Sequence, residues 1–508
     1  MLFHDPIFLF LFLPLTIGVS LFLRRFSKQE AVVTFLALAS VVFYGYWNPN
    51  FVPVLLGSIV FNYVLGQQLS VASDQKNGRA LLVFGIAANL GLLAGFKYLG
   101  MLTETAGFIL GHEVSAPKFE LPLGISFFTF LQIAYLVDAS RGQASETQFS
   151  RYFLFVTFFP HLIAGPLVHH RELIPQFARK LGHVWENLSV GLTIFGIGLF
   201  KKLVLSDHVG TWSDSLFNGA AGGIVPSLID SWVGALSFSL LIYFDFSAYS
   251  DMAIGLSKMF GIRLPENFNS PYKATSIIDF WRRWHMTLSR FLRDYLYVPL
   301  GGNRCGKIRR YLNLMLVMLL AGLWHGASWK FVVWGGMHGV YLLINHSWRK
   351  ATSIRLYEPL GIGITFLAVT FAWVPFRADT LQTAMTVYGG MIGWNGLVLP
   401  IHYQELLPNN LSLWMLSHGV TFGATSVYGG GTQLVILSIL MMIIWFLPNT
   451  QQITADFKPT LGSDAPPVTR LLRWKPARSF AIGMGIIGAY LLLLATQGKA
   501  GEFIYFQF

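Results

Sequence analysis

Long runs of apolar residues without charges recur along most of the 508-residue chain. They fall near 7–23, 31–47, 51–69, 80–96, 121–137, 152–168, 188–200, 232–248, 312–324, 331–345, 361–376, 433–448 and 479–498. A membrane-crossing helix needs about 20 apolar residues, whereas a membrane strand alternates apolar and polar positions over roughly ten. The runs therefore predict an all-α polytopic membrane protein. We expect about 11–13 membrane helices, with re-entrant or interfacial helices where a run is short or contains Pro and Gly.

The composition narrows the class further. Hydrophobic residues make up 54% of the chain and charged residues only 12%, about half the charged share of a soluble domain. A disordered, collagen-like or disulfide-stapled secreted protein is excluded. One cysteine excludes an intramolecular disulfide and a cysteine-rich metal site. No segment is long and polar enough for a separate soluble domain, so we expect residues 1–508 to form a single membrane domain.

The formal net charge of +12 is explained by the membrane and predicts no nucleic-acid partner. Basic residues of membrane proteins gather in cytoplasmic loops, where they face anionic lipid. The turn between the second and third runs, "NPN", carries no charge, whereas the loops on either side are basic. The basic residues of those loops are Arg24, Arg25, Lys28, Lys76 and Arg79. This asymmetry predicts that the N-terminus lies outside the cytoplasm. The segment before the final run is basic, with Arg470, Arg473, Lys475 and Arg478, so the last span leads outward and the C-terminus is also predicted to lie outside.

Segment 279–310 interleaves basic residues with aromatic and leucine side chains. On a continuous helix, one apolar stripe would be formed by Trp281, His285, Leu288 and Leu292. The basic faces of that helix would carry Arg282, Arg283, Arg290 and Arg293. The pattern predicts an interfacial basic helix. Its arginines either anchor the chain at the cytoplasmic surface or attract the phosphates of an acyl donor.

A histidine inside an apolar run is the clearest candidate for chemistry. His325 follows such a run in "AGLWHGAS", beside Trp324, which can form a wall of a water-poor pocket. Ionisable residues in membrane segments are costly and mark functional sites, although a hydrogen-bonded structural histidine is the alternative. Asp245 and Asp251 are expected to pair with arginines or to form an ion relay. We expect no metal at His161, His169 and His170, because no carboxylate stands at ligand spacing.

Several stretches resemble the membrane-bound O-acyltransferase family, in particular its bacterial polysaccharide O-acetyltransferase branch, to which the membrane subunit of alginate O-acetylation belongs. The resemblance lies in "YFDFSAYSDMAIGLSKMFGIRLPENFNSPYKATSIIDFWRRWHMTLSRFLRDYLYVPLGGNR", "AGLWHGASWKFVVWGGMHG", "FYGYWNP", "WVPFRA" and "FIYFQF". It implies a shell of helices around a central funnel or tunnel. The family histidine of the "WHG" motif maps onto His325, and the second signature position maps onto His285.

The resemblance also implies a function. We expect a bacterial inner-membrane enzyme that moves acetyl groups from a cytoplasmic donor, acetyl-CoA by family, toward an exported polysaccharide such as alginate or cellulose, with peptidoglycan as a further candidate. No bound cofactor is expected. The expected partner is a periplasmic SGNH-hydrolase-like acetyltransferase that completes the transfer. A neutral imidazole such as that of His325 can deprotonate the attacking hydroxyl, while His285 donates a hydrogen bond to the oxyanion.

Two other classes of function stay open from the residues. A transporter or lipid flippase would use the intramembrane acids and broken runs. A membrane scaffold for a periplasmic acetylase would carry no acyl chemistry of its own and would tolerate loss of His325.

The final run at 479–508 ends in an aromatic tail, "FIYFQF", with a single hydroxyl at Tyr505. A solvated tail is not expected to end in aromatic residues, so this one is predicted to fold back into an apolar cavity. From there Tyr505 either carries the acetyl group as an aryl ester, with a base to activate its phenol, or only packs.

Overall fold

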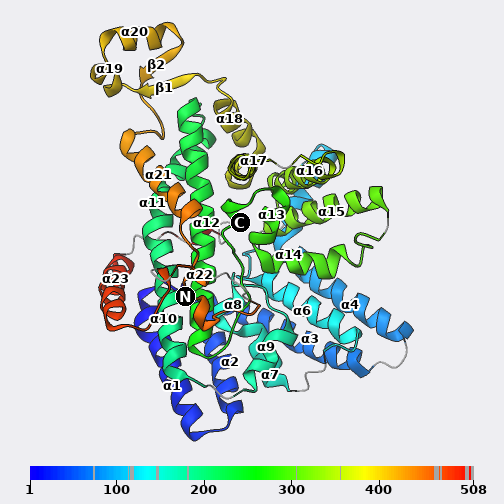
Figure 1. Cartoon of the computed structure of the whole chain (residues 1–508). Helices are drawn as coiled ribbons and strands as arrows, with labels where there is room; N and C mark the ends of the chain where they lie inside the picture. The colour runs from blue at the N-terminus through cyan, green and yellow to red at the C-terminus, as the bar shows by residue number, and fades with distance from the viewer. Residues whose placement is uncertain are drawn as a thin grey trace.

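The computed structural model describes residues 1–71, 75–112, 114, 119–144, 148–179, 182–304, 306–354, 356–462, 468–469, 472–497, 501 and 503–504. Over these residues the chain is an all-α polytopic membrane protein with one short strand pair (Figure 1). Six helical stretches in this part are long and apolar enough to cross a membrane: Phe8–Phe26, Pro49–Val71, Lys76–Leu110, Val184–Ala221, Leu228–Met259 and Glu358–Arg377. Shorter apolar helices accompany them at Gln29–Gly45, Ile125–Ser140, Gly431–Phe446 and Phe480–Thr496. The predicted fold class is confirmed; the total number of crossings stays a prediction.

The N-terminal part of the chain forms the lower and right-hand parts of the molecule in Figure 1, where α3 and α4 both pack against α6. Its helices are η1 (Phe8–Phe12), α1 (Leu13–Phe26), α2 (Gln29–Gly45), η2 (Pro49–Phe51), α3 (Val52–Val71), α4 (Gln75–Leu93), η3 (Ala94–Tyr98), α5 (Leu99–Leu110), α6 (Ile125–Ser140), α7 (Phe149–Thr157), α8 (Phe159–Leu162) and α9 (His170–Phe177). The run at 152–168 is broken between α7 and α8, where Pro160 follows the extended Phe158. Proline cannot continue the hydrogen-bond ladder of α7, which explains the break.

A central helix holds the two halves together. It is α12 (Leu228–Met259), which packs along α10 (Val184–Phe200), η4 (Lys201–Ser206) and α11 (Asp207–Ala221). Glycines allow this close approach: a Cβ added at Gly191 would stand 2.6 Å from the carbonyl oxygen of Gly255. Two helix backbones can come this near only where neither carries a side chain. Segments that are distant in the sequence therefore pack against the buried middle of α12.

The C-terminal half begins with α13 (Ile277–Arg283), α14 (Met286–Leu292) and η6 (Arg293–Tyr297), and continues with α15 (Lys307–His325), α16 (Trp329–Ala351), α17 (Glu358–Arg377) and α18 (Leu381–Met391). The predicted continuous helix over 279–310 is wrong. The chain breaks between α13 and α14, where His285 adopts a left-handed backbone with φ 43°. The apolar stripe from Trp281 to Leu292 is therefore not a single face.

A small lobe projects beyond the helices at the top of Figure 1. It contains β1 (Leu397–Pro400), α19 (His402–Leu406), α20 (Asn409–Ser417) and β2 (Val420–Gly423), with the two strands parallel. Asp230 ties its return segment to the start of α12, because its carboxylate accepts the backbone N–H groups of Val427 and Tyr428 at 2.9 and 2.8 Å. The remaining elements are η5 (Pro271–Lys273), α21 (Gly431–Phe446), α22 (Thr450–Ile453), η7 (Ala455–Phe457) and α23 (Arg478–Thr496).

Candidate active site

His325 ends α15 and lines a cavity of about 250 Å³. The cavity wall is mostly apolar, with a few polar side chains converging on it. Its residues are Trp47, Lys97, Glu120, Leu121, Pro122, Leu123, Gly124, Ile125, Ser126, Phe127, Ile163, Ala164, Trp324 and His325. The volume lies below that of pockets for drug-sized ligands and suits a small group such as a short acyl chain. His325 is only 6% exposed.

Close packing of α15 on α16 sets the position of His325. A Cβ added at Gly322 would overlap the carbonyl of Phe331, so the two helices meet without a side chain between them. As a result, the His325 imidazole lies edge-on to two aromatic rings, with centroids 5.0 Å from Trp334 and 5.4 Å from Phe376. The ring is held by packing, as a reacting group requires.

Lys97 and Tyr98 hold the last turn of α15 from outside. The Lys97 ammonium donates to the carbonyl oxygens of Trp324 and His325 at 2.7 and 3.2 Å, and the Tyr98 hydroxyl donates to Leu323 at 2.9 Å. The final carbonyls of a helix lack intrahelical partners, and a cation there also complements the helix dipole. Lys97 therefore fixes the backbone at His325 and also lines the cavity. Lys97 was not among the residues predicted from the sequence, although a lysine next to the apolar run at 80–96 is a signal of function.

His285 is fully buried, and its position is set by a loop residue. Its Nδ1 lies 3.1 Å from the side-chain oxygen of Asn267, which also accepts the Thr287 hydroxyl at 2.8 Å. An amide oxygen only accepts, so Nδ1 carries the proton and Nε2 the lone pair. The N–H of Met286 donates to the backbone oxygen of Asn267 at 2.9 Å. These bonds to Asn267 account for the left-handed backbone that breaks the helix.

Trp324 contacts both histidines. Its ring centroid is 4.9 Å from that of His325 and 6.1 Å from that of His285, and it stacks on Phe130 at 5.5 Å. The structure thus brings together Trp324, His325 and His285. Among them, Trp324 and His325 line the cavity, whereas His285 does not.

The four arginines of the predicted basic helix do not form one cluster. Arg290 makes two hydrogen bonds to Glu172 at 2.7 and 2.8 Å, Arg283 pairs with Asp279 at 3.0 Å, and Arg293 pairs with Asp294 at 2.7 Å. Arg282 is exposed. Three of the guanidiniums therefore already hold a carboxylate of the same chain, and none of the four lines the His325 cavity.

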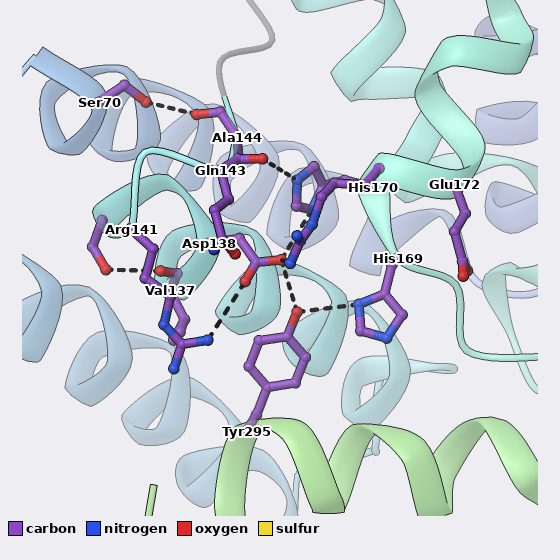
Figure 2. A network of polar contacts seen from close by, with 12 residues as sticks. Ser70, Val137, Asp138, Arg141, Gln143, Ala144, His169, His170, Glu172 and Tyr295 are labelled. Atoms are coloured by element: carbon purple, nitrogen blue, oxygen red, sulfur yellow. Dashed lines mark hydrogen bonds and ion pairs between the residues drawn. The ribbon is translucent and has the colours of Figure 1, made fainter. Parts of the chain in front are cut away.

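The far end of α6 carries a buried carboxylate network, shown in Figure 2. Asp138 accepts the Tyr295 hydroxyl at 2.8 Å and Arg171 at 3.1 Å. Because Tyr295 has only one proton, Nδ1 of His169 must be the donor in its 3.1 Å contact with that hydroxyl. Burial lowers the pKa of His170, so its ring is neutral and donates through Nε2 to Gln143. The network fixes η6, and with it the basic segment, against α6.

No group of three histidine, cysteine or acidic side chains that could hold a metal lies among the described residues. His169 and His170 take part in the Asp138 network, and His161 is buried elsewhere, against Phe158.

Asp245 and Asp251 of α12 pair with lysines, so the expected arginine partners are wrong. Asp251 accepts Lys201 at 2.6 Å, and Lys202 bridges Asp245 and Asp207 at 2.8 and 2.9 Å. Both lysines come from η4, where a π-helical turn lies against α12. Asp245 and Asp251 lie some tens of residues from these lysines, and no local pattern links them, whereas Asp207 directly follows η4.

The C-terminal tail reaches this same part of α12. Phe503 and Ile504 are each 3% exposed, as expected of a tail that folds back. The N–H of Ile504 donates to Asp245 at 2.8 Å, and the Phe503 ring stacks on Tyr249 at 4.6 Å. Phe503 also lies 5.9 Å from Phe246, whose ring stands 4.8 Å from that of His285. Tyr505 itself lies outside the described residues.

Comparison with known proteins gives the family. Residues 61–375 match the membrane-bound O-acyltransferase family. A peptidoglycan O-acetyltransferase of Helicobacter pylori is 43% identical over 479 residues, which cover 88% of this chain and 89% of the relative. The protein named "Probable alginate O-acetylase AlgI" of Pseudomonas putida is 39% identical over 523 residues, which cover 100% of both chains. A teichoic acid D-alanyltransferase of Bacillus subtilis is 28% identical and matches 50% of this chain and 67% of its own length. The chain therefore belongs to the membrane-bound O-acyltransferase family and is an O-acyltransferase.

Proposed function

We propose that this protein moves acetyl groups from a cytoplasmic donor, acetyl-CoA, across the bacterial inner membrane toward an exported polysaccharide. The observation that carries the proposal is the convergence of His325, Trp324 and Lys97 on one small cavity inside a membrane enzyme of the O-acyltransferase family. The relatives named for peptidoglycan and alginate acetylation support an extracytoplasmic glycan as the substrate class.

The position of the cavity supports transfer toward the outer side. Trp47, from the uncharged turn after α2, and Glu120, which precedes α6, both line it. The positive-inside rule assigns that turn to the side opposite Arg24 and Arg25. In this orientation both termini are periplasmic, and the far end of α6, with Asp138 and Tyr295, faces the cytoplasm, where the donor arrives.

The chemistry that we propose requires one base. The His325 imidazole takes the proton of an attacking hydroxyl as the new oxygen–carbon bond forms at the thioester carbonyl. The carbon–sulfur bond then breaks, and the leaving thiolate receives that proton from the imidazolium. A positioned base of this kind contributes about 10²–10⁴-fold to the rate.

We assign His285 a different part from the oxyanion donor that the sequence analysis expected. With its proton on Nδ1 and bound to Asn267, neutral His285 presents a lone pair at Nε2. A lone pair accepts a hydrogen bond and cannot stabilise a developing negative charge. We therefore propose that His285 accepts a proton from a hydroxyl group beside Trp324, or orients that hydroxyl.

The first acceptor that we propose is Tyr505. Ile504, directly before it, is anchored on Asp245, and Phe503 lies one ring away from His285. Attack by the phenol on the thioester gives an aryl acetate and free thiol. A periplasmic SGNH-hydrolase-like partner then takes the acetyl group onto its serine, returns the proton to the tyrosine and completes transfer to the sugar. No CoA needs to leave the cytoplasm in this scheme.

Thiol release tests the proposal. The full chain in lipid nanodiscs is supplied with acetyl-CoA, and free thiol is measured with and without the periplasmic partner. Release that requires His325 supports the enzyme. Polysaccharide acetylation in cells that persists without His325 would instead support a flippase or a passive scaffold. Analysis of the acetylated glycan, with alginate, cellulose and peptidoglycan extracted separately, identifies the polymer.

Lys97→Met is expected to lower the rate of thiol release on the order of 10–100-fold, because the backbone at His325 loses the cation that holds it and a small misplacement of a reacting group is costly. Lys97→Arg keeps the charge and the donors, and we expect it to recover most of the rate. Both variants are compared by size-exclusion profile to check folding. Equal rates for Lys97→Met and the wild type would remove Lys97 from the site.

Replacing both Arg290 and Arg293 by Gln is expected to raise the KM for acetyl-CoA on the order of tenfold and to leave the acceptor KM unchanged, if these arginines also contact donor phosphates. Each cation near an anionic group contributes only about 1 kcal/mol, so a single change is expected to raise the donor KM by only a few fold. The matched control is Arg349→Gln with Lys350→Gln, two cations at the end of α16. An unchanged donor KM would leave Arg290 and Arg293 with the carboxylates they hold in the structure.

A further inference from the structure

A second and larger cavity opens where α1 ends, far along the chain from His325. It measures about 430 Å³ and has a mixed lining of basic, polar and apolar side chains. Its apolar back is formed by Val32, Val33 and Leu36 of α2 together with Leu154 of α7. Five cationic side chains line it: Arg24, Arg179, Lys258, Arg263 and Lys458. We refer to it as the basic cavity.

The five cations come from distant parts of the chain. Arg24 is in the last turn of α1, Arg179 follows α9, and Lys258 is in the last turn of α12. Arg263 and Lys458 follow α12 and η7. No single basic loop explains the cluster, because the fold itself brings the charges together.

The described part of the chain contains no ion pair that neutralises these five. Elsewhere, partly buried cations hold carboxylates, as Arg151 does with Glu30 and Arg290 with Glu172. In the basic cavity, Arg24 donates to the carbonyl oxygen of Phe260 at 3.2 Å, and its buried Nε has no partner among the described residues. Lys258 is attracted by Glu186 and, more weakly, repelled by Arg263, but it makes no ion pair with Glu186 among the described residues. Like charges that converge without a carboxylate in ion-pair contact favour the binding of an anion.

Geometry favours an anion with several acceptor oxygens. Guanidinium groups bind phosphate through paired hydrogen bonds, and Arg24, Arg179 and Arg263 supply three of them. Two residues that line the cavity, His183 and Lys458, have left-handed backbones with φ 50° and 41°. A left-handed backbone costs free energy in a residue other than glycine, and such residues cluster at ligand-binding sites.

We propose that the basic cavity binds a phosphate-bearing ligand, at a site separate from the His325 cavity and independent of the acetyl-transfer scheme. Two sources share this chemistry: the headgroup of an anionic phospholipid and a soluble phosphate compound. The charges lie at the ends of apolar helices, where basic pockets bind lipid headgroups.

Two probes distinguish the sources. In detergent, binding of inorganic pyrophosphate to the full chain is measured by calorimetry. In nanodiscs, retained phosphatidylglycerol is counted by native mass spectrometry against phosphatidylcholine. We expect at least one of the two probes to bind the wild type with a measurable Kd.

Two pairs of substitutions test whether the cations of the basic cavity bind the probe. Arg179→Gln with Lys458→Gln removes two exposed cations, so folding is not at risk, and Arg24→Gln with Arg263→Gln removes two less exposed ones. Each pair is expected to weaken binding of that probe about thirtyfold, since each cation contributes about fivefold. The matched control is Arg25→Gln with Lys28→Gln, which removes the same charge from the same end of α1 but outside the cavity.

The outcomes separate cleanly. Binding of pyrophosphate alone assigns a soluble phosphate compound, and selective retention of phosphatidylglycerol alone assigns a lipid headgroup. Failure of both probes to bind, or equal weakening by the control pair, would overturn the proposal, because the charge would then act as a general basic surface. Thiol release from acetyl-CoA is measured in the same variants, so a failure of the acetyl-transfer proposal is seen independently.

Discussion

His325→Ala is expected to lower thiol release from acetyl-CoA by about 10²–10⁴-fold while the protein still inserts and folds. The His325 imidazole lines the small cavity together with Lys97. It ends α15, and packing against Trp334 of α16 holds it in place. Its removal only enlarges an existing cavity of about 250 Å³, so the loss of packing is tolerable. Release is measured on purified protein in nanodiscs, and glycan acetylation is measured in cells at equal protein level.

Two further variants make this first result specific. His325→Gln keeps most of the side-chain volume and some hydrogen bonding but cannot serve as a base, so it is expected to be as inactive as His325→Ala. His402→Ala changes an exposed histidine of the projecting lobe and is expected to retain wild-type activity. Release within a few fold of wild type in both His325 variants would assign that histidine a structural role.

Tyr505→Phe is expected to abolish glycan acetylation, because it removes the single oxygen that we propose accepts the acetyl group and keeps the ring. The anchoring of Ile504 on Asp245 and the stacking of Phe503 on Tyr249 do not depend on that oxygen. The tail is therefore expected to stay in place in the variant. Mass spectrometry of the wild-type C-terminal peptide is expected to detect acetyl-tyrosine after incubation with acetyl-CoA.

The control for the tail is Tyr490→Phe, which removes a hydroxyl from an exposed tyrosine on α23. It is expected to leave acetylation unchanged. If Tyr505→Phe acetylates the glycan near normally, the tyrosine packs and does not carry the acetyl group. If acetylation is lost but no acetyl-tyrosine forms in the wild type, the hydroxyl positions another acceptor.

The sequence predicts those residues of the site whose neighbours in the structure are also close to them in the chain. His325 and Trp324 stand together in "AGLWHGAS", and glycines next to them allow the close approach of α16. The break at His285 was not predictable in this way. The hydrophobic period over 279–310 favours one helix, but the loop before it supplies other partners. Asn267 accepts hydrogen bonds from His285 and Met286 at the start of α14, and the N–H of Asn269 donates to Arg283 at the end of α13.

For the charged residues too, the sequence predicts one property, and the packing of the helices decides the rest. The sequence predicts that basic residues gather at one side of the membrane, because anionic lipid and insertion favour that side. It does not predict that Arg290 meets Glu172, that Lys202 bridges two aspartates, or that Lys97 caps the helix of His325. Apart from Asp207, which directly follows η4, these partners come from segments far apart in the chain, and only their packing selects them.

The sequence by itself determined the class of this protein. In a bilayer each backbone N–H and C=O must be satisfied within its own segment, so long apolar runs have to become helices. The tertiary structure alone decided the small His325 cavity, the left-handed backbone at His285, the anchoring of the tail on Asp245 and the meeting of five cations in the basic cavity. Each of these depends on contacts between residues that are distant in sequence, and no local pattern of apolar and polar positions encodes such contacts.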